Sequence, residues 1–439
     1  MRGLMGITVL AACPRVKPRI VKPRIGDALA GAIVGAMPSQ PYGSREETFD
    51  AFARHVSPGK VTTYRKYGFD AVMGARDGVW FADAFGERRW INCHCNGGVF
   101  NLGHRHPKVV QAVREALDTL DVGNHHLVSG WRARLAERLA ASTGGALEGV
   151  VFGVSGGEAI DLAIKVCRAH TKRTGVVSAR GGYHGHTGLA LAAGDPQYRD
   201  PFGPNLPGFA QVPFDDLDAM DRTIGDDTAA VLLEPIPATL GMPIPKDGYL
   251  AGVQRFCRER GALFVVDEVQ TGLGRTGRAW CYQHDALDPD VLVTGKGLSG
   301  GVYPISATLM KRAIHDFFVE HPFVHISTFG GAELGCAAAL AVLDVIEAPG
   351  FLERVTALSE RFARELGTGP WELRRRGLFM GLKLPGEQMG MAAAKMLFDA
   401  GVFAVYANND TSVVQLLPPL IISDDEVTEL VRRVRGVFG

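Results

Sequence analysis

Three charged side chains follow apolar runs that are typical of strands buried on both faces. Glu234, Asp267 and Lys296 stand at the ends of the stretches AAVLLE, ALFVVD and VLVTGK. Because the carboxyl ends of parallel strands share one edge of a sheet, where open α/β sheets bind ligands, we expect these side chains to lie in one site. A lysine is rarely buried, and desolvation there favours its neutral amine, which is a nucleophile toward carbonyl groups.

Two glycine-rich stretches offer further ligand contacts. Gly156 and Gly157 open a predicted helix, where free N–H groups and the positive end of the helix dipole suit a phosphate. Tyr183 stands between glycines in GGYHGHTG, where its ring either stacks on a flat ligand or belongs to a turn. Neither stretch matches a dinucleotide-binding fingerprint or a P-loop.

Each of these features has a structural explanation when it stands alone. The glycines suit an ordinary helix entry, the acid after a strand can be capped or salt-bridged, and the lysine can reach a carboxylate. Together they match one cofactor, pyridoxal phosphate. Its aldehyde bonds a lysine, its pyridine nitrogen pairs with an acid, and its phosphate sits on a helix end.

The elements that position this site follow an alternating strand and helix pattern, which predicts a mostly parallel sheet with right-handed crossovers. Strands are expected at residues 149–155, 175–178, 229–233, 263–266 and 291–294, and later around 377–384 and 413–416. Helices are expected from Pro107, at 157–170, 335–347 and 352–366, and after Ser423, while 78–92 is typical of a hairpin.

Helix starts and inner faces are predicted from the same pattern. Ser155 with Glu158, and Ser423 with Glu426, have the spacing of capping boxes. Apolar residues at helical spacing are expected to face the core. They are Val109, Val110, Val113 and Leu117 in the first helix, Ile160, Ala163, Ile164 and Cys167 in the second, and Val427, Leu430, Val431 and Val434 in the last.

The chain resembles the class III aminotransferases, which are pyridoxal phosphate enzymes of fold type I, over about residues 50–436. The motifs that carry the resemblance are, in order, NLGHRHP, SGGEAIDLAIK, YHGHTG, LLEP, VVDEVQTGLGRTG, TGKGLSGG, STFGG and LLPPL. The resemblance implies an α/β fold with a large, mostly parallel-sheet domain and a smaller α+β domain. It also implies pyridoxal 5′-phosphate as cofactor.

The resemblance assigns roles to residues of this chain. Lys296 is expected to form the Schiff base with the cofactor and to carry the proton, and Asp267 to pair with the pyridine nitrogen. Val269 and Tyr183 are expected on the two faces of the ring, with Gln270 near the phenolic oxygen.

The phosphate is expected to bind Gly156 and Gly157. Thr328, from STFGG, is expected to complete the phosphate site from a neighbouring subunit, so the resemblance implies a homodimer with shared active sites.

Two positions depart from the family pattern. Many members that use glutamate or ornithine follow the Glu-Pro pair with QGEGG and carry an arginine three residues before the double proline. There the second glutamate and the arginine form a switchable ion pair, in which the arginine binds the α-carboxylate of one substrate and is neutralised by the glutamate for the other. Here the corresponding residues are Thr239 and Gln415, so both charges are missing together. Glu234, Thr239 and Gln415 are therefore candidates for the substrate site.

The expected activity is transfer of an amino group, in two half-reactions, from an ω-amine or an unusual amino acid to a keto acid or aldehyde. Two alternatives stay open. A racemase, epimerase or aminomutase on the same scaffold would use the same residues without consuming a keto or aldehyde co-substrate. A non-catalytic binding module would not need Lys296, Asp267, Tyr183 and Thr328 together.

A cysteine- and histidine-rich stretch, CHCNGGVFNLGHRH, raises the alternative of a zinc site. However, C-x-C is not the usual ligand spacing, and strand alternation would point His94 away from Cys93 and Cys95. His104 and His106 fall in the NLGHRHP motif that carries the resemblance, so we expect no metal.

Bulk composition narrows the class of protein. The 439 residues contain 47 Lys plus Arg and 47 Asp plus Glu, a balance that gives no reason to expect binding to nucleic acid or to an acidic membrane. Seven scattered cysteines do not describe a disulfide framework, which favours a reducing, cytoplasmic location. No apolar run reaches the roughly 18 residues of a membrane span.

The expected organisation has four parts. Residues 1–45, which include the repeat VKPRIVKPRI, are expected to be a disordered leader or to precede a true start at Met37, with a targeting peptide as the alternative. Residues 46–100 are expected to contribute to the small domain, residues 101–333 to form the large cofactor-binding domain, and residues 334–439 to form the C-terminal small domain.

Overall fold

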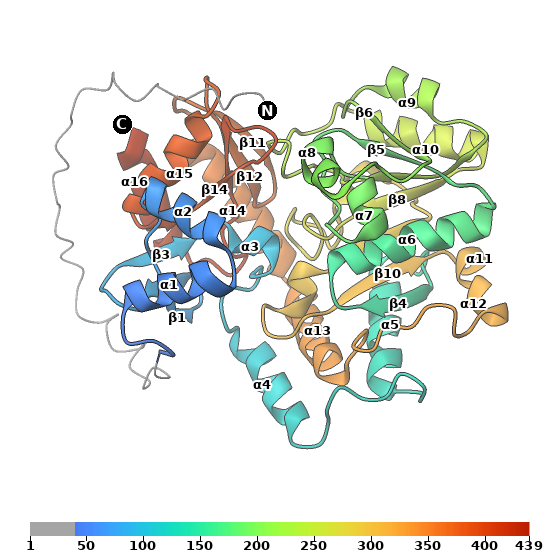
Figure 1. Cartoon of the computed structure of the whole chain (residues 1–439), viewed down its shortest axis with the longest axis horizontal. Coiled ribbons are helices and arrows are strands. Elements are labelled where there is room, and N and C mark those ends of the chain that lie inside the picture. Colours follow the sequence, from blue (N-terminus) through green and yellow to red (C-terminus); the bar gives the residue numbers. More distant parts are fainter. Residues whose placement is uncertain (1–39, 439) are drawn as a thin grey trace. The chain divides into compact units, whose positions relative to one another are not determined.

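The computed structural model describes residues 40–438, so most of the predicted leader lies outside the described residues. The chain from Pro41 onward forms one compact unit (Figure 1). It opens with helix α1 (Arg45–His55), whose first turn is capped by the Ser44 hydroxyl, and with α2 (Pro58–Tyr67), which has proline at its first position. The predicted domain boundaries at residues 100 and 333 stay predictions.

A seven-stranded sheet forms the centre of this unit, and its order is β4-β10-β9-β8-β7-β5-β6. The strands are β4 (Gly149–Gly153), β5 (Gly175–Ala179), β6 (Phe209–Val212), β7 (Thr228–Leu233), β8 (Leu263–Asp267), β9 (Val291–Thr294) and β10 (Ser306–Met310). Only β10 runs antiparallel to its neighbours, and the other pairings are parallel. The prediction of a mostly parallel sheet is therefore confirmed.

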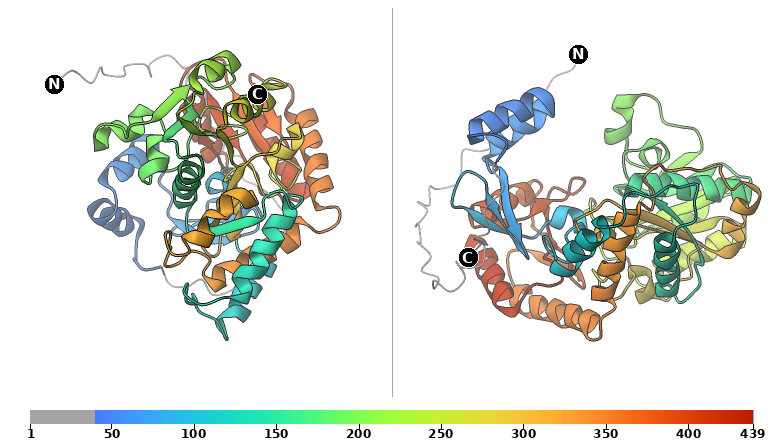
Figure 2. Two further views of the ribbon diagram at one scale, coloured as in Figure 1. Left: turned by 90° about the vertical axis from the view of Figure 1, so that its right-hand side faces the viewer. Right: turned by 90° about the horizontal axis from the view of Figure 1, so that it is seen from below.

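Helices cover both faces of this sheet (Figures 1 and 2). In β7, Val231 and Leu233 belong to one core and Ala230 and Leu232 to the other, as strand alternation requires. The first core contains side chains of α4 (Pro107–Leu117), α5 (Gly130–Ser142), α9 (Leu217–Thr223), α10 (Tyr249–Arg260) and α13 (Glu333–Ile346). The second contains side chains of α6 (Gly156–Thr171), α7 (Gly188–Ala192) and α11 (Arg312–His315).

Two four-stranded sheets lie outside the central sheet, and the first of them joins residues 73–92 to residues 402–403. One has the order β1-β2-β3-β13, from β1 (Met73–Asp77), β2 (Trp80–Asp83), β3 (Arg89–Asn92) and β13 (Val402–Phe403). The other has the order β11-β12-β15-β14, from β11 (Glu372–Arg376), β12 (Phe379–Lys383), β14 (Val405–Tyr406) and β15 (Val413–Leu416). Their common core also includes residues of α14 (Phe351–Leu366), α15 (Met389–Asp399) and α16 (Asp424–Phe438).

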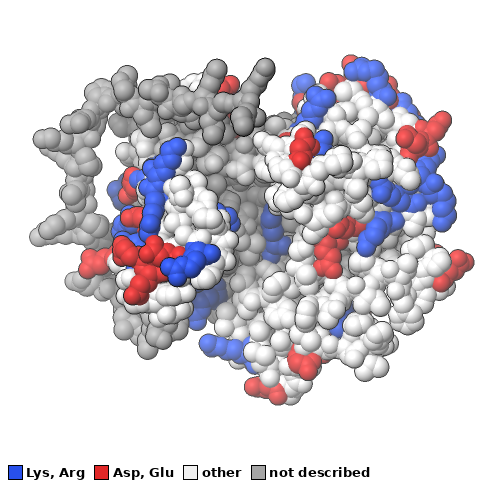
Figure 3. Space-filling view, viewed as in Figure 1, with Lys and Arg blue, Asp and Glu red and all other residues white. Residues whose placement is uncertain are grey.

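The connections between these elements contain shorter helices. They are α3 (Cys95–Gly98), α8 (Pro196–Arg199), η2 (Asp200–Phe202), η3 (Cys281–Asp285), η4 (Lys296–Ser299) and α12 (Phe317–Glu320). On the face shown in Figure 3, acidic and basic side chains lie in small groups of both signs. No single helix in residues 40–438 is long and apolar enough to cross a membrane; α13 and α14 reach that length only as a pair bent by 66°.

Most of the predicted elements are confirmed, and the exceptions have local causes. The buried faces of α6 and α16 are those predicted, but Leu117 is 59% exposed, so its placement in the core was wrong. It ends α4, past the buried residues Val109, Val113 and Ala116. Strands β1, β6, β10, β11, β13 and β14 and helices α1, α2, α5 and α15 were not predicted.

The two predicted capping boxes differ. At α16, Ser423 and Glu426 bond reciprocally, at 2.9 and 3.3 Å. At α6, the Ser155 hydroxyl accepts from the Glu158 N–H, but the Glu158 carboxylate accepts from the Val154 N–H, one residue before the cap. Of the two hydrogen bonds predicted for the capping box at α6, only the one from the Glu158 N–H to the Ser155 hydroxyl is therefore present.

A fully buried arginine joins three separate segments of this fold. Arg275 is 0% exposed, and burial lowers its pKa. Its guanidinium donates to Asn101 Oδ1 at 2.7 Å, to the Leu378 carbonyl at 3.2 Å and to the Pro418 carbonyl at 2.6 Å. These acceptors are neutral, so the buried charge is satisfied by hydrogen bonds alone.

Replacing this arginine should strongly destabilise the protein. Arg275→Met leaves two buried carbonyls and an amide without their donor, and we expect a loss of more than about 3 kcal/mol in the free energy of unfolding. Denaturant titration measures this loss, with Arg278→Met, at an exposed position three residues away, as the control. Equal midpoints for the two variants would contradict the role given to Arg275.

Candidate active site

Five strands of the central sheet end at the same edge, and the residues that follow them form one cluster. These strands are β4, β5, β7, β8 and β9, and they lead to Gly156, the loop of Tyr183, Glu234, Asp267 and Lys296. The five ends meet because the strands all point the same way, so the sequence-based expectation of a shared edge holds.

Lys296 lies at the centre of the cluster. Its Nζ donates to Gln270 Oε1 at 3.0 Å, and a Cβ added to Gly97 would lie 3.4 Å from both Cε and Nζ. Its backbone φ of 40° is unusual for a residue with a side chain and costs on the order of 1–3 kcal/mol, so the surroundings hold it there. Burial lowers the pKa of Lys296, although the charges of Asp267 and Glu234 act in the opposite direction. The amine is thus biased toward its nucleophilic form.

Asp267 is 4% exposed and is fixed by two neighbours. Its Oδ2 lies 2.8 Å from His184 Nδ1, and its Oδ1 accepts from the Val269 N–H at 3.1 Å. Burial acts to lower the pKa of His184, but the hydrogen bond to Asp267 and the nearby carboxylates outweigh it and raise this pKa. The contact therefore fixes the orientation of the Asp267 side chain, which points to a role as the partner of a cofactor ring nitrogen.

Glu234 lies beside this pair and is 6% exposed. Its Oε1 accepts from the Tyr183 N–H at 2.8 Å. Burial raises the pKa of Glu234 to about 7, assisted by the charge of Asp267 and opposed by His184, the Tyr183 N–H and Lys296. Glu234 thus holds the backbone of the loop that carries the Tyr183 ring.

At the start of α6, two glycines leave the backbone N–H groups uncovered by side chains, and we call this segment the phosphate cradle. A Cβ on Gly156 would lie 3.1 Å from Val269 Cγ1, and a Cβ on Gly157 would lie 2.9 Å from Thr187 Oγ1. The first N–H groups of a helix have no intrahelical partner, so these glycines offer free donors where no side chain fits. An amine, a carboxylate and a phosphate cradle at one sheet edge fit pyridoxal phosphate, with Val269 and Tyr183 as candidates for its two faces.

Three predicted site residues lie outside this cluster. Thr328 is exposed in the turn before α13. The Thr239 hydroxyl donates to the Gly181 carbonyl at 2.7 Å, so it already has a main-chain partner. Gln415 is 6% exposed in β15, opposite Gly381 of β12. The predicted roles of these residues stay predictions.

Sequence reasoning missed two residues of the cluster. His184 directly follows Tyr183 in the glycine-rich stretch, and a buried acid that needs a partner was the signal that pointed to such a residue. Gly97, whose backbone covers Lys296, was not predicted as part of the site. Its position depends on a loop in which Cys95, Asn96 and Gly98 also have positive φ, and this conformation is visible only in the folded structure.

The cysteine- and histidine-rich stretch is largely buried. Burial raises the pKa of Cys95 to about 12 and lowers the pKa of His94 to about 4, the latter with the charge of Lys296 acting in the same direction. His104 Nε2 lies 2.9 Å from Asn92 Nδ2. In the part of the chain that the structure describes, no three His, Cys, Asp or Glu side chains are grouped to hold a metal ion.

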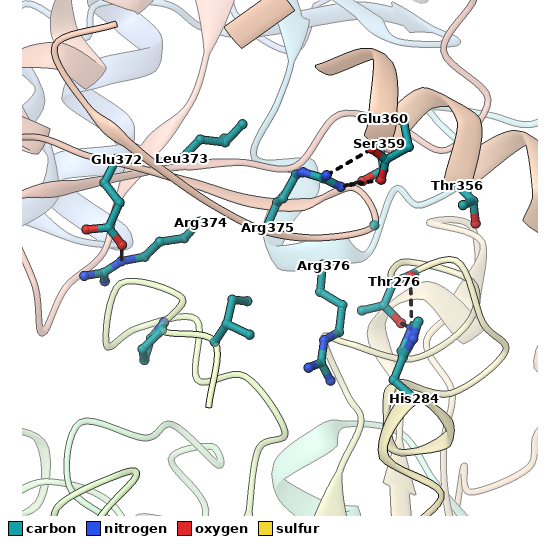
Figure 4. Close-up of a pocket in the computed structure, with 13 residues that line it drawn as sticks. Thr276, His284, Thr356, Ser359, Glu360, Glu372, Leu373, Arg374, Arg375 and Arg376 are labelled. Atoms are coloured by element: carbon teal, nitrogen blue, oxygen red, sulfur yellow. Dashed lines mark hydrogen bonds and ion pairs between the residues drawn. The ribbon is translucent and has the colours of Figure 1, made fainter. Parts of the chain in front are cut away.

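A pocket of about 620 Å³ lies away from the cluster, between β11, α14 and the loop around Thr276 (Figure 4). Three arginines line it, and each is paired with an acid. Arg374 donates to Glu372 at 3.1 Å, Arg375 to Glu360 at 3.0 Å, and Arg376 to Asp285 at 2.8 Å. Because their charges are already neutralised, the pocket does not resemble an anion site, and none of the predicted site residues lines it.

Comparison with known proteins agrees with this geometry. The family model for class III aminotransferases matches residues 65–438. An uncharacterized aminotransferase from Archaeoglobus fulgidus is 52% identical over 400 residues, which cover 90% of this chain and 94% of that protein. The putrescine aminotransferase of Pectobacterium atrosepticum is 34% identical over 417 residues, or 90% and 88% of the two chains.

Solved structures show the same fold. The ornithine aminotransferase of Toxoplasma gondii ME49 superposes with a TM-score of 0.82 at 28% identity, over 91% of this chain and 96% of that one. The predicted fold-type-I architecture is thereby confirmed. The family match spans the sheet, the lysine and the acid described above, and the chain belongs to the class III aminotransferase family and is a pyridoxal phosphate-dependent aminotransferase.

Proposed function

We propose that the amino donor of this aminotransferase is an ω-amine or an unusual amino acid, and that its site has no arginine, switched by a glutamate, to bind an α-carboxylate. The observation that carries the proposal is the neutral pair of residues at the two positions where glutamate-using relatives carry these charges. A keto acid or an aldehyde is the acceptor.

The surroundings of the two positions support this proposal. The Thr239 hydroxyl donates to the Gly181 carbonyl, and the Gln415 side chain is buried in β15. A charge at either position alone would be costly to bury. The 34% identity to a putrescine aminotransferase agrees with a donor that presents an amine at the end of a chain.

Each residue of the cluster has a separate proposed role in binding the cofactor or in moving a proton. When bound, pyridoxal phosphate supplies an aldehyde and an electron-withdrawing ring. We assign its phosphate to Gly156 and Gly157 and its ring nitrogen to Asp267, which His184 orients through the 2.8 Å contact. Lys296, with its lowered pKa and its hydrogen bond to Gln270, takes a proton from the substrate carbon at Nζ and returns it.

Lys296 can be tested by covalent trapping. Borohydride reduction of the holoenzyme, followed by peptide mapping, should place the pyridoxyl group on the peptide that contains Lys296. Lys296→Ala should lose this label and at least about 100-fold of turnover, because the proton carrier is gone.

The control for this variant is Lys246→Ala, at a lysine whose side chain is 81% exposed. Label on another lysine, or turnover near that of the wild type, would rule out the assignment. Consumption of the keto co-substrate in proportion to product separates transamination from isomerisation.

The substrate proposal can be tested by restoring the missing charges. Gln415→Arg, alone or together with Thr239→Glu, should raise the use of 2-oxoglutarate relative to a neutral aldehyde about 10-fold, since an arginine that is free of its glutamate partner binds a carboxylate. Gln415→Met, which changes shape without adding charge, is the control. An unchanged preference in a folded double variant would count against the proposal.

We also propose that the active enzyme is a homodimer. Exposed apolar side chains gather on two segments that contact each other, since Arg132 donates to the Gly331 carbonyl at 2.8 Å. They are Leu127, Val128, Trp131, Val319, Phe323, Val324, Ile326 and Phe329. Such a surface is typical of an interface, and Thr328 lies within it. We propose that this threonine reaches the phosphate cradle of the partner copy.

The dimer proposal predicts different effects for two variants. Val324→Asp, at a 61% exposed side chain, should give monomers in light-scattering experiments, whereas Val56→Asp, at a 66% exposed side chain outside this surface, should not. Thr328→Ala should leave the dimer intact and weaken cofactor binding about 10-fold. A wild-type protein that elutes as a monomer with full cofactor affinity would contradict the proposal.

A further inference from the structure

A single asparagine of the C-terminal sheet has every polar group of its side chain occupied. Asn409 lies in the turn between β14 and β15, and its Nδ2 donates to the Gly181 carbonyl at 2.9 Å and to Asp195 Oδ2 at 3.1 Å. Its Oδ1 accepts from the Tyr198 hydroxyl at 3.0 Å and from the Gln197 side-chain amide. An asparagine side chain offers two donors and two acceptor sites, so none is left free.

The orientation of this amide is fixed by its partners. The Gly181 carbonyl and the Asp195 carboxylate can only accept, and they face the NH₂ group, while donors face the oxygen. The Asn409 main-chain N–H adds a fifth contact, to the Thr239 carbonyl at 2.8 Å. The turn is therefore bound to two segments of the large sheet's edge.

These contacts converge on the Gly181 peptide. Its carbonyl accepts from both Asn409 and the Thr239 hydroxyl, and its N–H donates to Asp195 at 2.9 Å. Gly181 has a φ of 79°, and a Cβ there would lie 2.4 Å from Leu240, so only glycine fits this conformation. The Gly181 backbone is thus held at its N–H and at its carbonyl, in a conformation that sets the direction of the following residues.

The following residues belong to the cluster around Lys296. Tyr183 comes two residues after Gly181, and His184, which contacts Asp267, comes next. The Tyr183 ring also contacts His186, whose ring contacts Tyr198, at centroid distances of 5.1 and 5.5 Å. Asn409 therefore reaches Tyr183 by two routes, through the Gly181 peptide and through Tyr198.

We propose that Asn409 is a positioning residue, which through the Gly181 peptide and Tyr198 sets the loop that carries Tyr183 and His184. The C-terminal turn thereby controls the aromatic face of the cofactor site without touching the cofactor. This inference rests on the proposed place of Tyr183 beside the cofactor ring, and the experiment below separates the two.

The test uses Asn409→Ala and Asn409→Asp, with Asn408→Ala and Asn408→Asp at the exposed neighbouring position as matched controls. Hydrogen–deuterium exchange of the full-length apoenzyme reports on the loop without the cofactor. We expect both Asn409 variants to raise exchange in peptides covering residues 181–186 about 10-fold over the controls. Asn409→Asp should be at least as harmful as Asn409→Ala, because its carboxylate faces Asp195.

A charge exchange sharpens the test. In the double variant Asn409→Asp with Asp195→Asn, the donor and acceptor between these two residues are restored in reverse, so exchange should fall back part of the way toward wild type. Wild-type exchange at residues 181–186 in Asn409→Ala or Asn409→Asp would overturn the proposal. So would a uniform rise over all peptides, which indicates general destabilisation.

Cofactor titration of the same variants tests the proposed place of Tyr183. Cofactor binding that is about 10-fold weaker, together with faster exchange, supports both the positioning role of Asn409 and the place of Tyr183 against the cofactor ring. Faster exchange with unchanged cofactor affinity supports the positioning role of Asn409 and overturns the place of Tyr183 against the ring. In the Asn409 variants, kcat/KM for the donor and for the acceptor should change together with the exchange of the loop. A residue that only stabilises the fold would not change these ratios.

Discussion

The burial of two carboxylates and one amine at a single sheet edge constrains much of this structure. Asp267 and Glu234 are 4% and 6% exposed, so each needs hydrogen-bond donors to offset the loss of water. One loop supplies a donor to each of them, through the Tyr183 N–H and the His184 ring, and the Val269 N–H also donates to Asp267. The loop that carries the aromatic ring is therefore fixed by the same contacts that make the charges tolerable.

The amine side of this arrangement is held by backbone. Lys296 has a left-handed φ between two glycines, and the strained loop at Gly97 covers its side chain. A strained backbone conformation persists only where the surrounding contacts stabilise it by more than the strain costs. Here the end of β9 on one side and the covering loop on the other provide that support.

Sequence reasoning succeeded where one local signal was enough. An apolar run followed by a charge placed Glu234, Asp267 and Lys296 correctly at the sheet edge, and the helical spacing of apolar residues predicted the buried face of α6. It missed β6 and β10, whose runs are short and carry polar residues such as Gln211 and Thr308. Helix α5 has too weak an apolar stripe, with only two buried residues.

Contacts between distant segments were beyond that reasoning. Asn409 lies 228 positions from Gly181, and no spacing in the chain relates the two. The departure at Thr239 was visible as a missing charge, but its hydrogen bond to Gly181 was not. The fold therefore gives this residue a structural role that its sequence position does not reveal, because its hydroxyl helps to hold the loop that carries Tyr183.

Arg275 has a consequence for how this enzyme can move. Its buried guanidinium contacts Asn101, the turn at Leu378 and the double proline at Pro418, so these segments cannot slide past one another without separating a buried cation from its acceptors. A rotation centred on this side chain would keep all of those contacts. A movement of these segments relative to one another that keeps the contacts is therefore a rotation about the Arg275 side chain rather than a translation.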